Sequence, residues 1–106
     1  MRCAGITVEE YKAKTLVKNK LILVNFKADW CIVCRKQDPI INAIKTAKKD
    51  KLELIIIDMD DNPLISEHFE VNALPVFKLY RDGLLLWDHK GLLSEREILD
   101  AIRPFE

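Results

Sequence analysis

The sequence predicts an α/β domain in which a central mixed β-sheet is flanked by helices on both faces. Short apolar runs rich in strand-forming residues alternate with stretches of helical patterning, which favours parallel strands joined by helical crossovers. Near the C-terminus, the turn Arg81-Asp82-Gly83 separates two strand-like runs and indicates a hairpin that makes one end of the sheet antiparallel. The predicted order of elements is β-α-β-α-β-α-β-β-α.

The chain is expected to form one domain over residues 1–106. A length of 106 residues is typical of a single domain and is enough to bury a core without a disulfide or a metal. The composition, 49% hydrophobic and 32% charged, is that of a globular chain rather than a disordered one. The sequence shows no repeat, low-complexity segment or linker.

The first part of the chain carries one clear helix signal and one clear strand signal. A weak first strand is expected at Cys3–Ile6. Thr7-Val8-Glu9-Glu10 is a capping-box pattern, which predicts a helix that continues to about Lys18. The apolar run Leu21–Phe26 then reads as a buried parallel strand.

The middle of the chain repeats this helix and strand alternation. A second helix is expected from near Cys31 to about Lys49, and Pro39 inside it should kink it. Leu52–Ile57 is another apolar run, predicted to be a buried strand. Asn62-Pro63 places an N-cap residue before a proline, which predicts a helix start.

The last part of the chain is predicted to hold the hairpin and a final helix. Val76–Tyr80 and Leu84–Asp88 are the two strands on either side of the turn. Ser94-Glu95-Arg96-Glu97 is a second capping box and predicts a helix that continues to about Arg103.

Charge and hydropathy argue against two classes of partner. The 17 Lys and Arg balance the 17 Asp and Glu, whereas binding to nucleic acid or to an anionic membrane usually needs a basic excess. No run approaches the roughly 18 apolar residues of a membrane span. The N-terminus shows no secretory signal, so we expect a cytoplasmic protein, although a domain cut from an exported or membrane protein remains an alternative.

Two of the three cysteines are spaced for redox chemistry. Cys31 and Cys34 follow a strand and a short loop, and they open a helix. The free N–H groups and the dipole at a helix N-terminus stabilise a thiolate on Cys31, which is the attacking species. The spacing of three brings Cys34 back over Cys31. We therefore expect Cys31 to attack a substrate disulfide and Cys34 to resolve the mixed disulfide.

Other uses of these cysteines are less well supported. A structural zinc site usually needs four ligands, and Cys3, His68 and His89 lack metal-ligand spacing, so no metal is predicted. An inert buried pair is the other alternative. Cys3 is expected to be a small apolar filler, with a regulatory thiol as its alternative, and the two histidines are assigned no role. No dinucleotide fingerprint is present, so no flavin or nicotinamide cofactor is expected.

These features together resemble the thioredoxin family over essentially the whole chain. The matching residues are Ala28 to Cys34, Pro39, Asp60 to Pro63, Leu74-Pro75, Gly83 and Gly91. The resemblance implies a thioredoxin fold and a cis bond before Pro75, where an ordinary trans proline at a strand start is the alternative.

The same resemblance implies a place for the substrate. Pro75 should lie beside the cysteines, and the backbone of Leu74 should pair with an extended substrate segment. Trp30, Leu74, Pro75 and Gly91 would together line an apolar substrate groove.

Three departures from the family pattern bear on mechanism. The family's Gly-Pro between the cysteines is Ile32-Val33 here, which makes the approach to Cys31 more apolar. Its buried aspartate is replaced by Asn25 and the partner lysine by Ile56. Both halves of a buried ion pair are therefore lost together, so neither is left as an unpaired buried charge.

Asp38 is a candidate substitute for the missing aspartate. It follows Cys34 by four residues, one helical turn on and on the same face. The motif Ala28-Asp29-Trp30-Cys31 with a carboxylate at this place is also similar to the C-terminal domain of the DsbD transporter. We hypothesise that Asp38 accepts the proton of Cys34, the alternative being an ordinary solvent-exposed carboxylate.

The function expected from the sequence is a disulfide reductase. It would act on disulfide-containing proteins as a monomer, recharged by an external reductase. An apolar spacer and a nearby carboxylate disfavour a stabilised thiolate, which predicts a reductant rather than an oxidant. A dedicated electron relay of DsbD type and a non-catalytic binding module remain alternatives.

Overall fold

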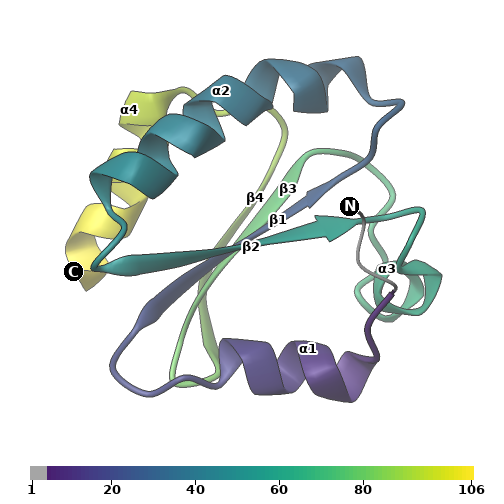
Figure 1. Cartoon of the computed structure of the whole chain (residues 1–106), viewed down its shortest axis with the longest axis horizontal. Coiled ribbons are helices and arrows are strands. Elements are labelled where there is room, and N and C mark those ends of the chain that lie inside the picture. The colour runs from purple at the N-terminus through teal and green to yellow at the C-terminus, as the bar shows by residue number, and fades with distance from the viewer. Residues whose placement is uncertain (1–4) are drawn as a thin grey trace.

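A computed structural model describes residues 5–106 and shows a four-stranded sheet in the order β2-β1-β3-β4 (Figure 1). β1 pairs parallel with β2 and antiparallel with β3, and β3 pairs antiparallel with β4. The strands are β1 (Leu21–Lys27), β2 (Leu52–Asp58), β3 (Val76–Arg81) and β4 (Leu84–Lys90). The helices are α1 (Val8–Thr15), α2 (Ile32–Ala47), α3 (Pro63–His68) and α4 (Glu95–Ile102), followed by the 3₁₀ turn η1 (Arg103–Phe105).

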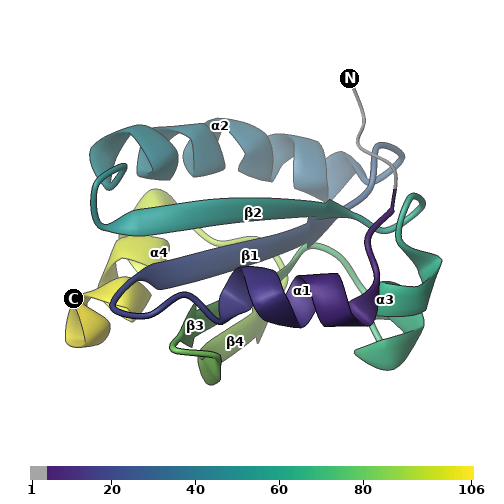
Figure 2. The same cartoon turned by 60° about the horizontal axis from the view of Figure 1, so that its bottom comes forward.

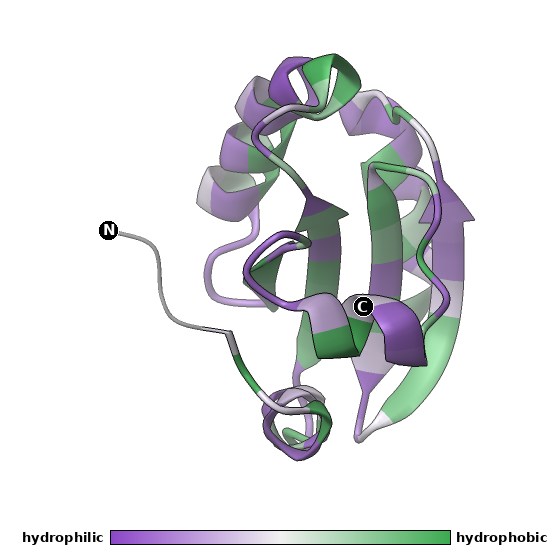
Figure 3. Ribbon diagram, turned by 90° about the vertical axis from the view of Figure 1, so that its right-hand side faces the viewer, coloured by the Kyte–Doolittle hydropathy of each residue, from purple (hydrophilic) through white to green (hydrophobic). Residues whose placement is uncertain are grey.

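The helices cover both faces of this sheet. α2 and α4 lie together on one face, and α1 and α3 lie on the other (Figures 1 and 2). Each face buries its own apolar cluster: Ile44 and Ile98 belong to the first, Tyr11 and Ile65 to the second. Figure 3 shows that the central strands are mainly hydrophobic, whereas the helices mix hydrophilic and hydrophobic residues. The predicted mixed sheet with helices on both faces is therefore confirmed.

The two parallel strands differ in burial, contrary to the prediction that both are buried. Every residue of β1 from Leu21 to Phe26 is buried, because neighbouring strands flank it and helices cover both of its faces. β2 is an edge strand of the described sheet, and Glu53 and Ile56 are exposed, Ile56 by 46%. An apolar run alone does not distinguish these two positions.

Both predicted capping boxes are present. The side chains of Thr7 and Ser94 each accept a hydrogen bond from the third helical N–H, and the glutamates at those positions bond back to the cap. α1 ends at Thr15, a turn before the expected Lys18, and α4 continues into η1. α2 runs on through Pro39, which lies inside it as predicted.

Asn62 is the N-cap residue of α3 and Pro63 follows it in the first turn, as predicted, but the Asn62 side chain does not cap the helix. Instead, it accepts a hydrogen bond from the Ile6 backbone N–H at 2.8 Å and donates one to the Asp58 carbonyl at 2.8 Å. The buried amide therefore ties the segment before α1 to the end of β2.

The strand expected at Cys3–Ile6 falls largely outside the described residues. Cys3 is outside them, and Gly5 and Ile6 lie in no strand. At the other end, the hairpin turn has positive φ at Asp82 (52°) and Gly83 (81°), as a two-residue turn between twisted strands requires. Of the helices in residues 5–106, none is long and apolar enough to cross a membrane.

Candidate active site

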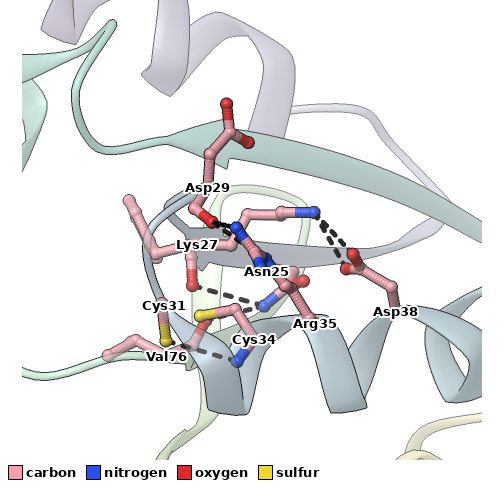
Figure 4. Close-up of polar contacts among 9 residues, drawn as sticks. Asn25, Lys27, Asp29, Cys31, Cys34, Arg35, Asp38 and Val76 are labelled. Atoms are coloured by element: carbon pink, nitrogen blue, oxygen red, sulfur yellow. Dashed lines mark hydrogen bonds and ion pairs between the residues drawn. The ribbon is translucent and has the colours of Figure 1, made fainter.

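The two cysteines lie where β1 leads into α2, and both thiols are free. Cys31 is the N-cap of α2, and its Sγ accepts a hydrogen bond from the Cys34 backbone N–H at 3.2 Å (Figure 4). The predicted helix start implied this interaction, because the N–H groups of the first turn have no partner within the helix and one of them points at the sulfur. Cys31 is 8% exposed and Cys34 is 1% exposed. Of the two cysteines, only Cys31 therefore has exposed surface that an incoming substrate can contact.

Two contacts hold the loop that carries Cys31. Arg35 donates from Nε and Nη2 to the Asp29 carbonyl, at 3.1 and 2.8 Å. Trp30, which is 66% exposed, donates from Nε1 to Asp60 Oδ1 at 3.4 Å. The role of Arg35 was not predicted. The sequence shows only a basic residue in the first turn of α2, and such a residue does not by itself indicate a hydrogen bond to the preceding loop.

Cys34 is held in its thiol form. Burial raises the pKa of Cys34 to about 11, and the hydrogen bond with Cys31 acts in the same direction. A backbone hydrogen bond with Ala28 and the charge of Lys27 oppose this rise. Cys34 must therefore lose its proton to a base before it can attack a mixed disulfide.

No ionisable group stands where the family has its buried aspartate. Asn25 is 1% exposed, and its Nδ2 donates to the carbonyls of Phe26 and Val76 at 3.4 and 3.5 Å (Figure 4). Its register partner on β2 is Ile56. The amide is thus satisfied by backbone carbonyls, and it supplies no charge to Cys34.

A different ion pair lies beside the cysteines. Lys27 Nζ bonds both carboxylate oxygens of Asp38, at 2.9 and 3.0 Å (Figure 4). Lys27 follows Asn25 by two residues on β1, so both side chains project to the face that α2 covers. Asp38 lies one turn beyond Cys34 on α2, as predicted, with its carboxylate turned toward Lys27. A role was predicted from the sequence for Asp38 but not for Lys27. The only indication of Lys27 in the sequence is a charged residue at the end of an apolar strand.

Of the four predicted groove residues, Trp30 and Leu74 line one pocket with Cys31, and Pro75 and Gly91 are joined to each other. The Leu74–Pro75 bond is cis, as the resemblance implied. Leu74 packs against the cluster that contains both cysteines, and Pro75 accepts a hydrogen bond from the Gly91 N–H at 2.8 Å. Gly91 has φ of 104°, which favours glycine.

Gln37 on α2 holds the chain next to Gly91, a role that was not predicted from the sequence. Its side-chain amide donates to the Leu93 carbonyl and accepts from the Leu93 N–H, both at 2.8 Å. The two hydrogen bonds are buried and fix the chain just after Gly91. A polar residue on the buried face of a helix was the available signal.

Each of the two histidines contacts a neighbouring aromatic ring. His68 packs edge-on against Phe69, and His89 stacks on Trp87. Within residues 5–106, no three His, Cys, Asp or Glu side chains are grouped to hold a metal ion.

Comparison with known proteins agrees with this geometry. The family model Thioredoxin matches residues 3–104. A thioredoxin-like protein of Synechocystis is 31% identical over 97% of this chain and 94% of its own length. A thioredoxin of Rickettsia felis is 29% identical over 92% of this chain and 93% of its own, and the chloroplastic thioredoxin Y2 of Arabidopsis thaliana is 34% identical over 95% of this chain and 65% of its own.

Among solved structures, a malaria-parasite thioredoxin-2 superposes on this chain with a TM-score of 0.79. The match covers 83% of this chain and 85% of the thioredoxin-2 chain. Its 24% identity supports the fold alone. The family match spans nearly the whole chain, and the free Cys31–Cys34 pair stands at the start of α2. The chain therefore belongs to the thioredoxin family, whose members are thiol–disulfide oxidoreductases that reduce disulfides.

Proposed function

We propose that this protein reduces protein disulfides, with Cys31 as the nucleophile and Cys34 as the resolving cysteine. The observation that carries the proposal is the N-terminal turn of α2, where Cys31 Sγ accepts the Cys34 N–H while Cys34 itself lies buried behind it. The two cysteines thus have different access to a substrate, as the two steps of the exchange require.

The reaction balances as a two-electron transfer. The Cys31 thiolate attacks one sulfur of the substrate disulfide, and the other substrate sulfur leaves as a thiolate. Cys34 then loses its proton and attacks Cys31 Sγ, which forms the Cys31–Cys34 disulfide and releases the second substrate thiol. An external dithiol reductase returns two electrons to the pair.

Insulin reduction with dithiothreitol as donor tests this proposal. The wild-type chain should precipitate reduced insulin, Cys31→Ser should abolish the activity, and Cys34→Ser should accumulate a mixed disulfide. A wild-type chain that leaves insulin intact would favour the alternative of a binding module with incidental cysteines.

The direction of electron flow is part of the proposal. The apolar Ile32-Val33 spacer and the nearby Asp38 carboxylate disfavour a stabilised thiolate, so we expect a reduction potential nearer the roughly −270 mV of thioredoxin than the roughly −120 mV of DsbA. Equilibration with glutathione or dithiothreitol measures it. A potential near that of DsbA would mean that the protein oxidises its substrates.

Asp38 is proposed as the acceptor of the Cys34 proton. It is the carboxylate one turn beyond Cys34 on α2, and the buried thiol needs a base. Asp38→Asn should slow the release of substrate from the mixed disulfide and alter its pH dependence. Asp100→Asn, on α4, is the matched control. An unchanged pH–rate profile in Asp38→Asn would remove this role.

The cellular setting is also proposed. We expect a monomer that works in the cytoplasm, where thiols are kept reduced and an external reductase is available as donor. The carboxylate at position 38 favours a DsbD-type relay as the second candidate function. Rapid exchange with one exported partner, together with poor insulin reduction, would support the relay.

A further inference from the structure

A pocket of about 740 Å³ opens directly beside the attacking cysteine. Cys31 and Trp30 border it on the side of the redox site, and Leu74 borders it ahead of the cis proline. Its far side is formed by α3 and the chain that follows α3. The pocket therefore lies within reach of the residues next to the cysteine of a polypeptide joined to Cys31 through a mixed disulfide.

The inner part of the pocket is apolar. Met59, Val71 and Leu74 are half-buried and line it together with the exposed indole of Trp30. Such a surface binds an apolar side chain, because contact removes apolar area from water on both partners. The apolar lining by itself does not distinguish one substrate from another.

The rim of the pocket is acidic. Asp60, Glu67 and Glu70 line it, and no Lys or Arg does. Asp60 is partly engaged by Trp30 Nε1. Glu67 and Glu70 are exposed, and within residues 5–106 neither forms an ion pair. Because the whole chain has a formal net charge of zero, this negative charge is a local property of the pocket.

We propose that this pocket binds the segment flanking the target cysteine of a substrate and selects segments in which a Lys or Arg accompanies an apolar side chain. The apolar residue packs against Met59 and Trp30, and the cationic group lies at the rim near Glu67 and Glu70. The inference rests on the proposed reductase function and gives it a substrate class. Its basis is the continuity of the pocket with Cys31 and the charge of its rim.

Two disulfide-bonded peptides that differ at one position test this preference. Each carries an apolar residue near its cysteine, followed by Lys in one peptide and Glu in the other. Pre-reduced protein should reduce the Lys peptide about 1.5-fold to fivefold faster at low salt, the range expected for exposed charge pairs. The difference should shrink in high salt, because ions screen exposed charges.

Variants locate the preference on the rim. In Glu67→Gln/Glu70→Gln the Lys and Glu peptides should react at nearly equal rates, and Glu67→Lys/Glu70→Lys should prefer the Glu peptide. The matched control is Glu53→Gln/Glu95→Gln, which removes two exposed glutamates from β2 and α4 and should keep the wild-type preference.

The outcomes separate this inference from the function on which it rests. Hydroxyethyl disulfide, which is small and uncharged, reports on the thiols alone. If the wild type reduces it but reduces both peptides equally, or if the preference survives in Glu67→Gln/Glu70→Gln, the inference is overturned. If the wild type reduces none of the three disulfides, the proposed function fails and this inference fails with it.

Discussion

At the scale of single residues, the chemistry depends on a contrast between two identical side chains. Cys31 and Cys34 stand three apart, yet Cys31 caps the helix with 8% of its surface exposed, whereas Cys34 is only 1% exposed. The N–H that Cys34 donates to Cys31 favours charge on the first sulfur, whereas burial disfavours charge on the second. The order of attack and resolution follows from this asymmetry.

Alkylation should reveal this contrast. Because the pKa of Cys34 is raised to about 11, its thiol stays protonated at neutral pH and loses its proton only as the pH approaches that value. Iodoacetamide at pH 7.5 should therefore modify Cys31 and leave Cys34 intact. Tandem mass spectrometry of the peptide that contains both cysteines reads this directly, and adducts mainly on Cys34 would contradict it.

Lys27 should hold the pKa of Cys34 below the value that burial alone would set. Lys27→Met removes a positive charge and leaves the charge of Asp38 unneutralised, and both changes disfavour the thiolate. The pKa of Cys34 should rise further, as measured by NMR titration of its Cβ. Lys27→Arg keeps the charge and should leave the pKa close to that of the wild type.

At the scale of elements, local signals start the helices and tertiary contacts join them. The capping boxes at Thr7 and Ser94 satisfy helix N–H groups from within one turn of the chain. Gln37 instead makes a tertiary contact, because its side chain extends from α2 to Leu93, which is 56 residues further along the chain. The chain after Gly91 depends on this second kind of contact, since Gln37 anchors it.

Ser94→Ala should destabilise the protein by about 1 kcal/mol, the usual cost of losing an N-cap side chain. The Glu97 N–H would lose its acceptor at the start of α4. Urea unfolding measures the change. Ser94→Asp, which can cap equally well, is the control and should unfold near the wild-type midpoint.

Gln37→Leu should cost about 2 to 4 kcal/mol, because it leaves the buried N–H and carbonyl of Leu93 without their partner, each at roughly 1 to 3 kcal/mol with partial relief by water. The loop that carries Gly91 should also become less ordered, which would raise KM for a protein substrate. Asn42→Leu, an exposed position on the same helix, is the comparison. Equal stability of the two variants would show that the Gln37 contacts contribute little.

At the scale of the whole molecule, the sheet separates two apolar clusters and decides which apolar residues belong to them. In β2, Ile57 is 3% exposed and packs with Tyr11 and Ile65, whereas its neighbour Ile56 is 46% exposed. The two residues are chemically identical and adjacent. They differ only in the face of the edge strand to which each side chain projects.

Ile57→Ala and Ile56→Ala form a matched pair that tests this difference. Ile57→Ala should cost about 2 to 5 kcal/mol, because it removes a buried side chain and leaves a cavity. Ile56→Ala should cost less than about 1 kcal/mol, since much of that side chain stays in water. Equal losses in urea unfolding would mean that β2 is buried on both faces in solution.

The features that sequence alone predicted are those controlled by neighbouring residues. Capping boxes, the hairpin turn and the Cys31–Cys34 spacing act within a few residues of the chain, and each appears in the structure as expected. Asn62 stands at the predicted N-cap position, but its side-chain oxygen accepts a hydrogen bond from a distant backbone group, the Ile6 N–H, instead of from the helix. That competition cannot be seen in the local pattern.

The sequence by itself thus determined the fold class, the redox pair and the family resemblance, since all of these depend on hydrophobic periodicity, turn chemistry and short spacings. Only the folded chain places Lys27 beside Asp38, Gln37 on Leu93, and Glu67 and Glu70 on the pocket that Cys31 borders. The physical reason is that side-chain interactions fall off within a few ångströms, so residues far apart in sequence interact only after the sheet and helices have brought them together.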